Sequence, residues 1–169
     1  MAETVNQNLS GVAETLLLPL YIRAMESQRS DALIKDDKAV ALIKNLNPDS
    51  SWITKMRVDE GDKVGLVLRN REFDRYARDF LTCHPEAVVV HIGCGLDSRF
   101  ERVDNGTVEW YDLDLPEVIE LRRKLIGGEG ARYHYLRRPT LHTADTLRSL
   151  RVRLMLTVGR HSMKSRWSQ

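Results

Sequence analysis

A glycine-rich turn follows a short run of β-branched residues near the middle of the sequence. The turn contains Gly93, Cys94 and Gly95, and Asp97 comes two residues later. A glycine turn directly after a buried parallel strand lets backbone N–H groups come close to a ligand, and nucleotide-like ligands bind at such strand ends. A lone Gly-x-Gly is weak evidence, because turns between strands and helices also use glycine for steric reasons.

Two acidic residues, Asp112 and Asp114, end the next strand that the sequence predicts. Asp114 lies 19 residues after Gly95, and an acid about 20 residues after such a turn can accept hydrogen bonds from both hydroxyls of a ribose. Asp114 could instead cap a helix in a capping box with Glu117, and Asp112 could be a solvated strand end. Taken together, the turn and the acids favour an adenosine-containing cofactor.

The residues after the glycine turn bear on which cofactor this is. Dinucleotide-binding turns have a third glycine, whereas this sequence has Asp97-Ser98. A carboxylate beside the turn would repel a pyrophosphate, and it would suit the cationic amino-acid end of S-adenosylmethionine. A nicotinamide dehydrogenase is therefore a weaker alternative than a protein that binds S-adenosylmethionine.

An α/β fold would position these residues. Apolar spacing predicts helices at residues 15–25, with a break at Pro19, and at 36–45, 61–81 and 116–126. Strand patterns occur at residues 87–92, 108–113, 133–136 and 150–158. The strand–helix–strand order after residue 86 predicts a parallel sheet. We expect one domain, made of an N-terminal helical segment (1–82), a cofactor-binding core (83–136) and a divergent tail (137–169).

Composition narrows the class of protein. The chain has 169 residues, of which 42% are hydrophobic and 30% charged, as in a soluble globular domain. No apolar run approaches the roughly 20 residues of a membrane span, and no signal peptide pattern is present. The two cysteines form neither a disulfide framework nor a metal-ligand cluster. We therefore expect a cytoplasmic protein without a membrane partner or a metal.

The charge is unevenly distributed along the chain. From Arg137 onward there are eight Lys or Arg and one acid, whereas the preceding residues carry 18 basic and 23 acidic side chains. Such a basic tail can bind nucleic acid. We rank that alternative last, because the tail has little aromatic interleaving beyond Trp167.

Three motifs carry a resemblance to a known family. They are His91-Ile92-Gly93-Cys94-Gly95-Leu96-Asp97-Ser98-Arg99-Phe100, Trp110-Tyr111-Asp112-Leu113-Asp114-Leu115-Pro116 and Arg122-Arg123-Lys124-Leu125. With upstream segments 14–26, 36–40 and 68–74, they resemble the leucine carboxyl methyltransferase family over about residues 9–136, in its bacterial branch that includes polyketide O-methyltransferases. The resemblance implies a Rossmann-like class I methyltransferase fold. It also implies S-adenosylmethionine as cofactor, and methyl transfer to an oxygen of a small molecule or carboxylate.

The resemblance further implies which residues contact the cofactor. Arg69, and also Arg23, would bind the methionine carboxylate, because a guanidinium holds a carboxylate at two points. Gly93 with Gly95 would form the glycine-turn contact, and Asp114 would bind the ribose.

No residue is nominated as catalytic. Holding the methyl donor and the acceptor in line supplies much of the rate enhancement, so a general base is not required by the chemistry. His91 lies in a buried strand, and we expect it to be a satisfied core histidine. Cys94 is a candidate cofactor-binding residue as part of the glycine turn, although a cysteine at such a position is more often a small packing residue than a nucleophile.

The resemblance ends near Leu136, where Arg138-Pro139-Thr140 follows the third strand and the basic tail begins. A truncated or out-of-register carboxyl end would explain both observations, whereas a basic arm would explain only the charge. An incomplete sheet would leave the edge of residues 88–92 unpaired, which favours instability, homodimerisation or aggregation unless residues 150–158 fill it. The alternative to an active enzyme is therefore a non-catalytic S-adenosylmethionine-binding remnant, or a subunit that needs a partner chain.

Overall fold

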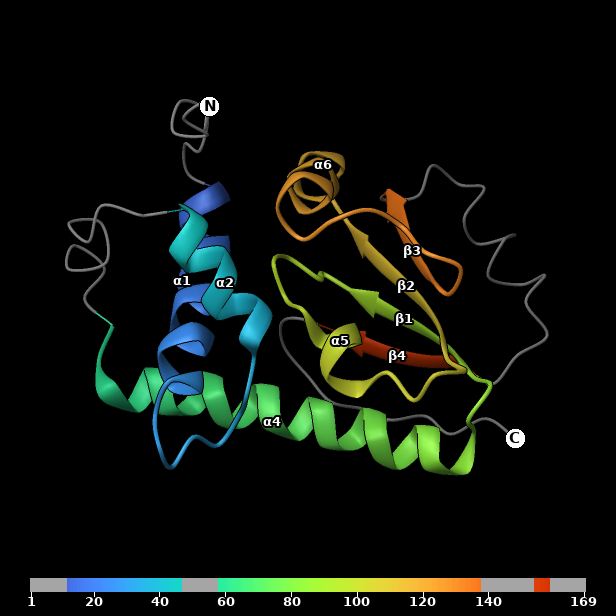
Figure 1. Cartoon of the computed structure of the whole chain (residues 1–169), viewed down its shortest axis with the longest axis horizontal. Coiled ribbons are helices and arrows are strands. Elements are labelled where there is room, and N and C mark those ends of the chain that lie inside the picture. Colours follow the sequence, from blue (N-terminus) through green and yellow to red (C-terminus); the bar gives the residue numbers. More distant parts are fainter. Residues whose placement is uncertain (1–11, 47–57, 138–153, 159–169) are drawn as a thin grey trace.

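The structure, a computed structural model, describes residues 12–46, 58–137 and 154–158. Figure 1 shows how its helices and strands are arranged. In chain order they are α1 (Val12–Ser27), α2 (Asp37–Leu46), α4 (Glu60–Cys83), β1 (Val88–Ile92), α5 (Arg99–Val103), β2 (Glu109–Asp114), α6 (Pro116–Leu125), β3 (Tyr133–Arg137) and β4 (Leu154–Val158).

The strands form one parallel sheet in the order β3-β2-β1-β4. The β-branched run Val88-Val89-Val90 is 3% exposed or less, as expected for a strand buried on both faces. Alternation of parallel strands with helices confirms the α/β, Rossmann-like fold that the sequence predicts.

β4 occupies the edge of β1 that the sequence analysis left open. Its five residues pair with β1 in parallel, from Val88 opposite Leu154 to Ile92 opposite Val158. This is the outcome in which residues 150–158 fill the edge.

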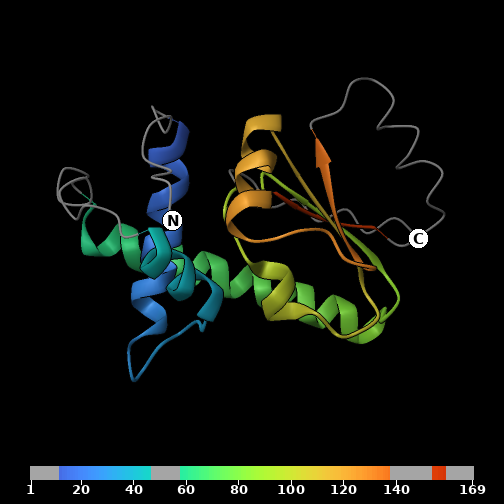
Figure 2. The ribbon, with the colours of Figure 1, turned by 45° about the horizontal axis from the view of Figure 1, so that its top comes forward.

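Three helices cover the same face of the sheet. Val89 and Trp110, on this face, pack against Ala77 of α4 and Val103 of α5. Ile119 of α6 packs against residues of β3 and of the glycine turn. α4 continues beyond the sheet and also runs beneath α1, so it joins the N-terminal helices to the sheet (Figures 1 and 2).

α1 and α2 lie side by side (Figure 1). Leu20 and Ala24 of α1 pack with Ala39 of α2 and with Leu96 of the turn after β1. The predicted break at Pro19 is wrong, because α1 continues through this residue. Proline removes one backbone hydrogen bond, and full burial of Leu20 and Ala24 in this cluster offsets that loss.

The short helix α5 is not predicted by the sequence pattern. It contains five residues, too few for a helical period to show. Among the described helices, none is both long and apolar enough to span a bilayer.

Candidate cofactor-binding site

The glycine turn and Asp114 meet at one edge of the sheet. Ile92 lies opposite Leu113 in the parallel register, so the segments that follow β1 and end β2 are neighbours. The N–H of Gly93 donates to the carbonyl of Leu113 at 2.8 Å, and the N–H of Gly95 donates to Asp114 Oδ2 at 2.8 Å. The convergence expected from the sequence is therefore present.

Both glycines have a backbone that favours glycine. Gly93 has φ 68° and Gly95 has φ 50°, in the left-handed region that other residues rarely adopt. A Cβ at Gly95 would also lie 3.1 Å from Cδ2 of Leu16 in α1. A side chain at position 95 would therefore strain the turn and press on α1.

Asp114 does not cap α6, contrary to the capping-box interpretation. The N-cap of α6 is Leu115, which makes no side-chain capping bond. Asp114 is half-buried, and its Oδ1 accepts a hydrogen bond from the N–H of Leu115 at 2.8 Å. Each carboxylate oxygen thus has one backbone donor, and lone pairs remain for a ligand.

Asp112 lies in the interior and is 1% exposed. Its carboxylate forms an ion pair with Arg122 and accepts hydrogen bonds from Tyr133 Oη at 2.5 Å and Trp110 Nε1 at 2.9 Å. Burial raises the pKa of Asp112, but the Arg122 guanidinium and His91 outweigh it, and the pKa is below its usual value. The structure gives Asp112 the role of joining β2 to α6, and Asp114 is the acid that lies beside the glycine turn.

Asp97 also points inward, where it meets three arginines. Its carboxylate lies 2.8 Å from Arg99 Nη2, 2.9 Å from Arg102 Nη2 and 3.9 Å from Arg23 Nε. Burial alone would raise the pKa of Asp97, but these guanidinium groups hold it well below its usual range. Because the charge is neutralised, Asp97 does not explain a preference for S-adenosylmethionine over a pyrophosphate ligand.

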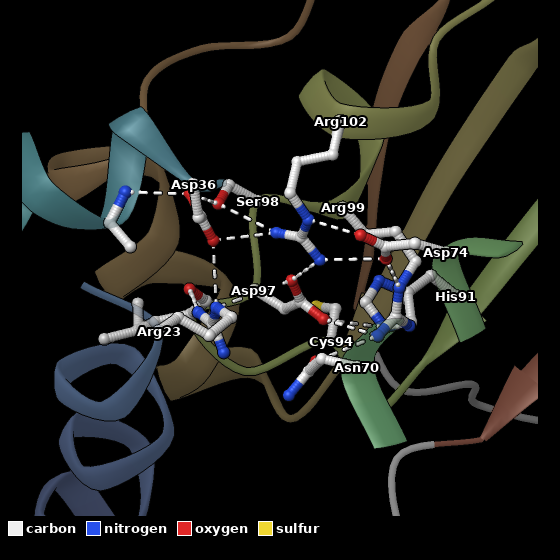
Figure 3. A network of polar contacts seen from close by, with 12 residues as sticks. Arg23, Asp36, Asn70, Asp74, His91, Cys94, Asp97, Ser98, Arg99 and Arg102 are labelled. Carbon is white, nitrogen blue, oxygen red and sulfur yellow. Dashed lines mark hydrogen bonds and ion pairs between the residues drawn. The ribbon is translucent and has the colours of Figure 1, made fainter. Parts of the chain in front are cut away.

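Asp97 belongs to a buried network of charges that joins the N-terminal helices to the sheet (Figure 3). Arg102 is central to it. Its guanidinium lies 2.6 Å from Asp74 Oδ2 on α4 and 2.7 Å from Asp36 Oδ2 before α2. Ser98 donates to Asp36 Oδ1 at 2.6 Å. The network has three guanidinium and three carboxylate groups, so its charges balance: Arg23, Arg99, Arg102, Asp36, Asp74 and Asp97.

The two arginines that the resemblance assigned to the methionine carboxylate are in different environments. Arg23 is 2% exposed, and its guanidinium donates to Asp36 at 2.9 Å and to the carbonyl of Leu96 at 2.7 Å. Arg69 lies on the exposed side of α4. A carboxylate could reach Arg23 only after its present bonds break, whereas Arg69 is accessible.

His91 is a satisfied core histidine, as expected, and the side chain of Cys94 is packed in the core. His91 Nδ1 lies 3.1 Å from Asp112 Oδ1, and its Nε2 lies 3.0 Å from Arg99 Nη1, so the ring connects two charged groups. Burial, followed by the charge of Arg99, lowers the pKa of His91, which keeps the ring neutral. Cys94 is 1% exposed and packs against Ile119, and burial raises the pKa of its thiol well above the usual value.

The sequence analysis gave no role to Arg122 or Arg102, although both have central positions. Arg122 lies within a quoted motif, but the run Arg122-Arg123-Lys124 has the composition of a solvated helix face. Arg102 follows the motif that ends at Phe100. The spacing of Arg122 could have predicted its burial, because it lies four residues after the apolar Val118 and therefore on the same side of α6.

Comparisons with known proteins identify the family of this chain. A sequence model described as "Leucine carboxyl methyltransferase" matches residues 17–156, which extends past Leu136 and into β4. The chain is 42% identical over 126 residues to the tetracenomycin polyketide synthesis O-methyltransferase TcmP of Streptomyces glaucescens, covering 74% of this chain and 45% of that protein. It is 29% identical over 126 residues to the S-adenosyl-L-methionine-dependent methyltransferase dpfgK of Gibberella zeae, covering 70% and 42%. The chain therefore spans less than half the length of these curated relatives.

Proposed function

Because the chain belongs to the leucine carboxyl methyltransferase family, whose cofactor is S-adenosylmethionine, we propose that the edge of the sheet at Gly93, Gly95 and Asp114 binds the adenosyl part of that cofactor. The supporting observation is the hydrogen bond of 2.8 Å between the Gly95 N–H and Asp114 Oδ2. It joins the glycine turn and the acid at the carboxyl ends of adjacent parallel strands, where nucleotide-like ligands bind.

The groups at this edge fit an adenosyl ligand. Asp114 accepts one backbone N–H on each oxygen, and a carboxylate offers about four acceptor positions, so two hydroxyls can still bind. Gly93 is exposed and lacks a side chain that would obstruct a ligand. For the methionine carboxylate we propose Arg69 rather than Arg23. The side chain of Arg69 makes no hydrogen bond or ion pair to another described residue, whereas Arg23 is bound to Asp36.

The proposed reaction is methyl transfer to an oxygen of a small molecule, such as a polyketide, or of a carboxylate. S-adenosylmethionine supplies an electrophilic methyl group on a positively charged sulfur. The residues of this chain would bind and orient the reactants, and orientation of donor and acceptor supplies much of the rate enhancement. The name of TcmP supports oxygen as the acceptor atom.

A second proposal is that the chain binds the cofactor but requires a partner chain for catalysis. It is supported by the partial coverage of the relative, since the match to this chain covers 45% of TcmP. Incubation with radiolabelled S-adenosylmethionine and a panel of phenolic and carboxylate acceptors separates the two proposals. Transfer by the isolated chain supports the enzyme, and binding without transfer supports the subunit.

Isothermal titration calorimetry with S-adenosylmethionine tests the site. We expect Asp114→Asn to weaken binding about tenfold or more, because it removes a charge-assisted acceptor. Glu117→Gln is the matched control, since this exposed acid lies in the first turn of α6, three residues away. No binding by the folded wild-type chain, or equal binding by Asp114→Asn, would reject the site. A parallel NADH fluorescence titration distinguishes a nicotinamide site.

A further inference from the structure

Two buried arginines, from α6 and α1, donate to carbonyl groups of the turn after β1. Arg122 of α6 donates to the carbonyl of Gly95 at 2.6 Å and to that of Asp97 at 2.8 Å. Arg23 of α1 donates to the intervening carbonyl of Leu96 at 2.7 Å. Three consecutive carbonyl groups are therefore bound by guanidinium groups, which fixes the path of the turn more firmly than backbone bonds alone.

Arg122 is itself held rigidly. It is 1% exposed, and its guanidinium pairs with Asp112 and donates to Tyr133 Oη at 2.9 Å. Tyr133 in turn donates to Asp112 at 2.5 Å, and Asp112 also accepts from Trp110. The planar guanidinium thus joins β2 and β3 to the turn after β1, and these bonds need the fork of donors that arginine has and lysine lacks.

The effect of Arg122 reaches the site through Gly95. The carbonyl of Gly95 binds Arg122, while the N–H of the same residue donates to Asp114 Oδ2. Any shift of Gly95 therefore changes the orientation of the Asp114 carboxylate. We propose that Arg122 is a positioning residue for S-adenosylmethionine binding, which sets the orientation of the ribose acceptor by holding Gly95. This inference rests on the proposed function.

The test compares Arg122→Lys with the wild-type chain. Lysine keeps the charge beside Asp112 but cannot bind two carbonyl groups and a carboxylate in one plane. We expect S-adenosylmethionine to bind about tenfold more weakly, the effect of losing one charge-assisted hydrogen bond. The amide resonance of Gly95 should shift, and its hydrogen exchange should be faster even without cofactor. Arg123→Lys is the matched control, because the neighbouring Arg123 is partly exposed and pairs with Glu129 at the surface.

Tyr133→Phe provides a second, milder variant. It removes one hydrogen-bond partner of Arg122 while keeping both members of the ion pair, and we expect a weakening of binding of a few-fold. If Arg122→Lys does not fold, this variant decides the question. If the wild-type chain binds S-adenosylmethionine and the folded variant has the same dissociation constant and the same Gly95 hydrogen exchange, the proposed role of Arg122 is overturned. The proposed function is then not affected. Absence of binding by the wild-type chain would overturn the proposed function together with this inference.

Discussion

Replacement of Arg102 by methionine should destabilise the protein strongly. The side chain of Arg102 is 6% exposed and contacts three carboxylates, at 2.6 Å (Asp74), 2.7 Å (Asp36) and 2.9 Å (Asp97). Without it, three buried carboxylates face two guanidinium groups. Removal of one partner from a buried ion pair costs about 3–5 kcal/mol, a large share of the roughly 5–15 kcal/mol that stabilises a typical domain.

Urea denaturation followed by circular dichroism measures this loss. For an m-value of about 2 kcal/mol per M, the midpoint should fall by roughly 2 M. Arg75→Met is the matched control, because the side chain of Arg75 is 52% exposed and forms surface pairs with Glu72 and Asp79. Such exposed pairs contribute about 0–1 kcal/mol, so the control should shift the midpoint little.

A double variant tests whether charge balance is the cause. Arg102→Met with Asp74→Asn leaves two guanidinium and two carboxylate groups in the network. We expect the double variant to lose less unfolding free energy than the two single variants lose in sum, because each remaining charge in the network still has a counterpart. A loss below about 1 kcal/mol for Arg102→Met, equal to that of Arg75→Met, would refute the conclusion that this network is buried.

Two further predictions concern pH and the sheet edge. Burial and Arg99 lower the pKa of His91 in the folded state, so the unfolded chain binds the proton more readily, and stability should fall as the pH drops below about 6.5. Urea denaturation at pH 7 and pH 5.5 should show this loss of stability, which is at most about 1.4 kcal/mol per pH unit for one group. The contribution of His91 should be absent from His91→Gln. An equal dependence of stability on pH in the variant and the wild type would contradict a buried neutral ring. Met155→Pro with Leu156→Pro should remove β4 from β1, because adjacent N–H groups face opposite sides and one of the two faces β1. We expect self-association in light scattering, and a monomer with an unchanged melting temperature would contradict the pairing.

The sequence predicted much of the fold because the relevant signals are local. The run from Val88 to Ile92 is β-branched, α4 has an extended apolar stripe, and glycines mark the turn, so each element could be placed within a few residues of its observed bounds. The exceptions have physical reasons. Pro19 does not break α1, since packing outweighs one lost hydrogen bond, and α5 is too short to show a period.

The candidate site was predicted only in part. The turn at Gly93 and Gly95 and the acid at Asp114 follow from strand-end chemistry, and the structure joins them by a hydrogen bond. Asp112 lies two residues before Asp114, and Asp97 lies two residues after Gly95. Both therefore have the residue type and a sequence position suitable for a ligand-binding acid. Instead, Asp112 pairs with Arg122 of α6 and Asp97 meets three arginines of α1 and α5, and no local pattern distinguishes these acids from Asp114.

The sequence by itself determined the parallel strands, the glycine turn and the carboxylate beside it, because backbone geometry and burial periodicity depend on near neighbours in the chain. Only the tertiary structure decided which charged residues enter the core. Asp36 and Arg102 are 66 residues apart in sequence and form one ion pair at 2.7 Å. A charge can leave water only where opposite charges from several elements surround it, and those partners come together only when the chain has folded.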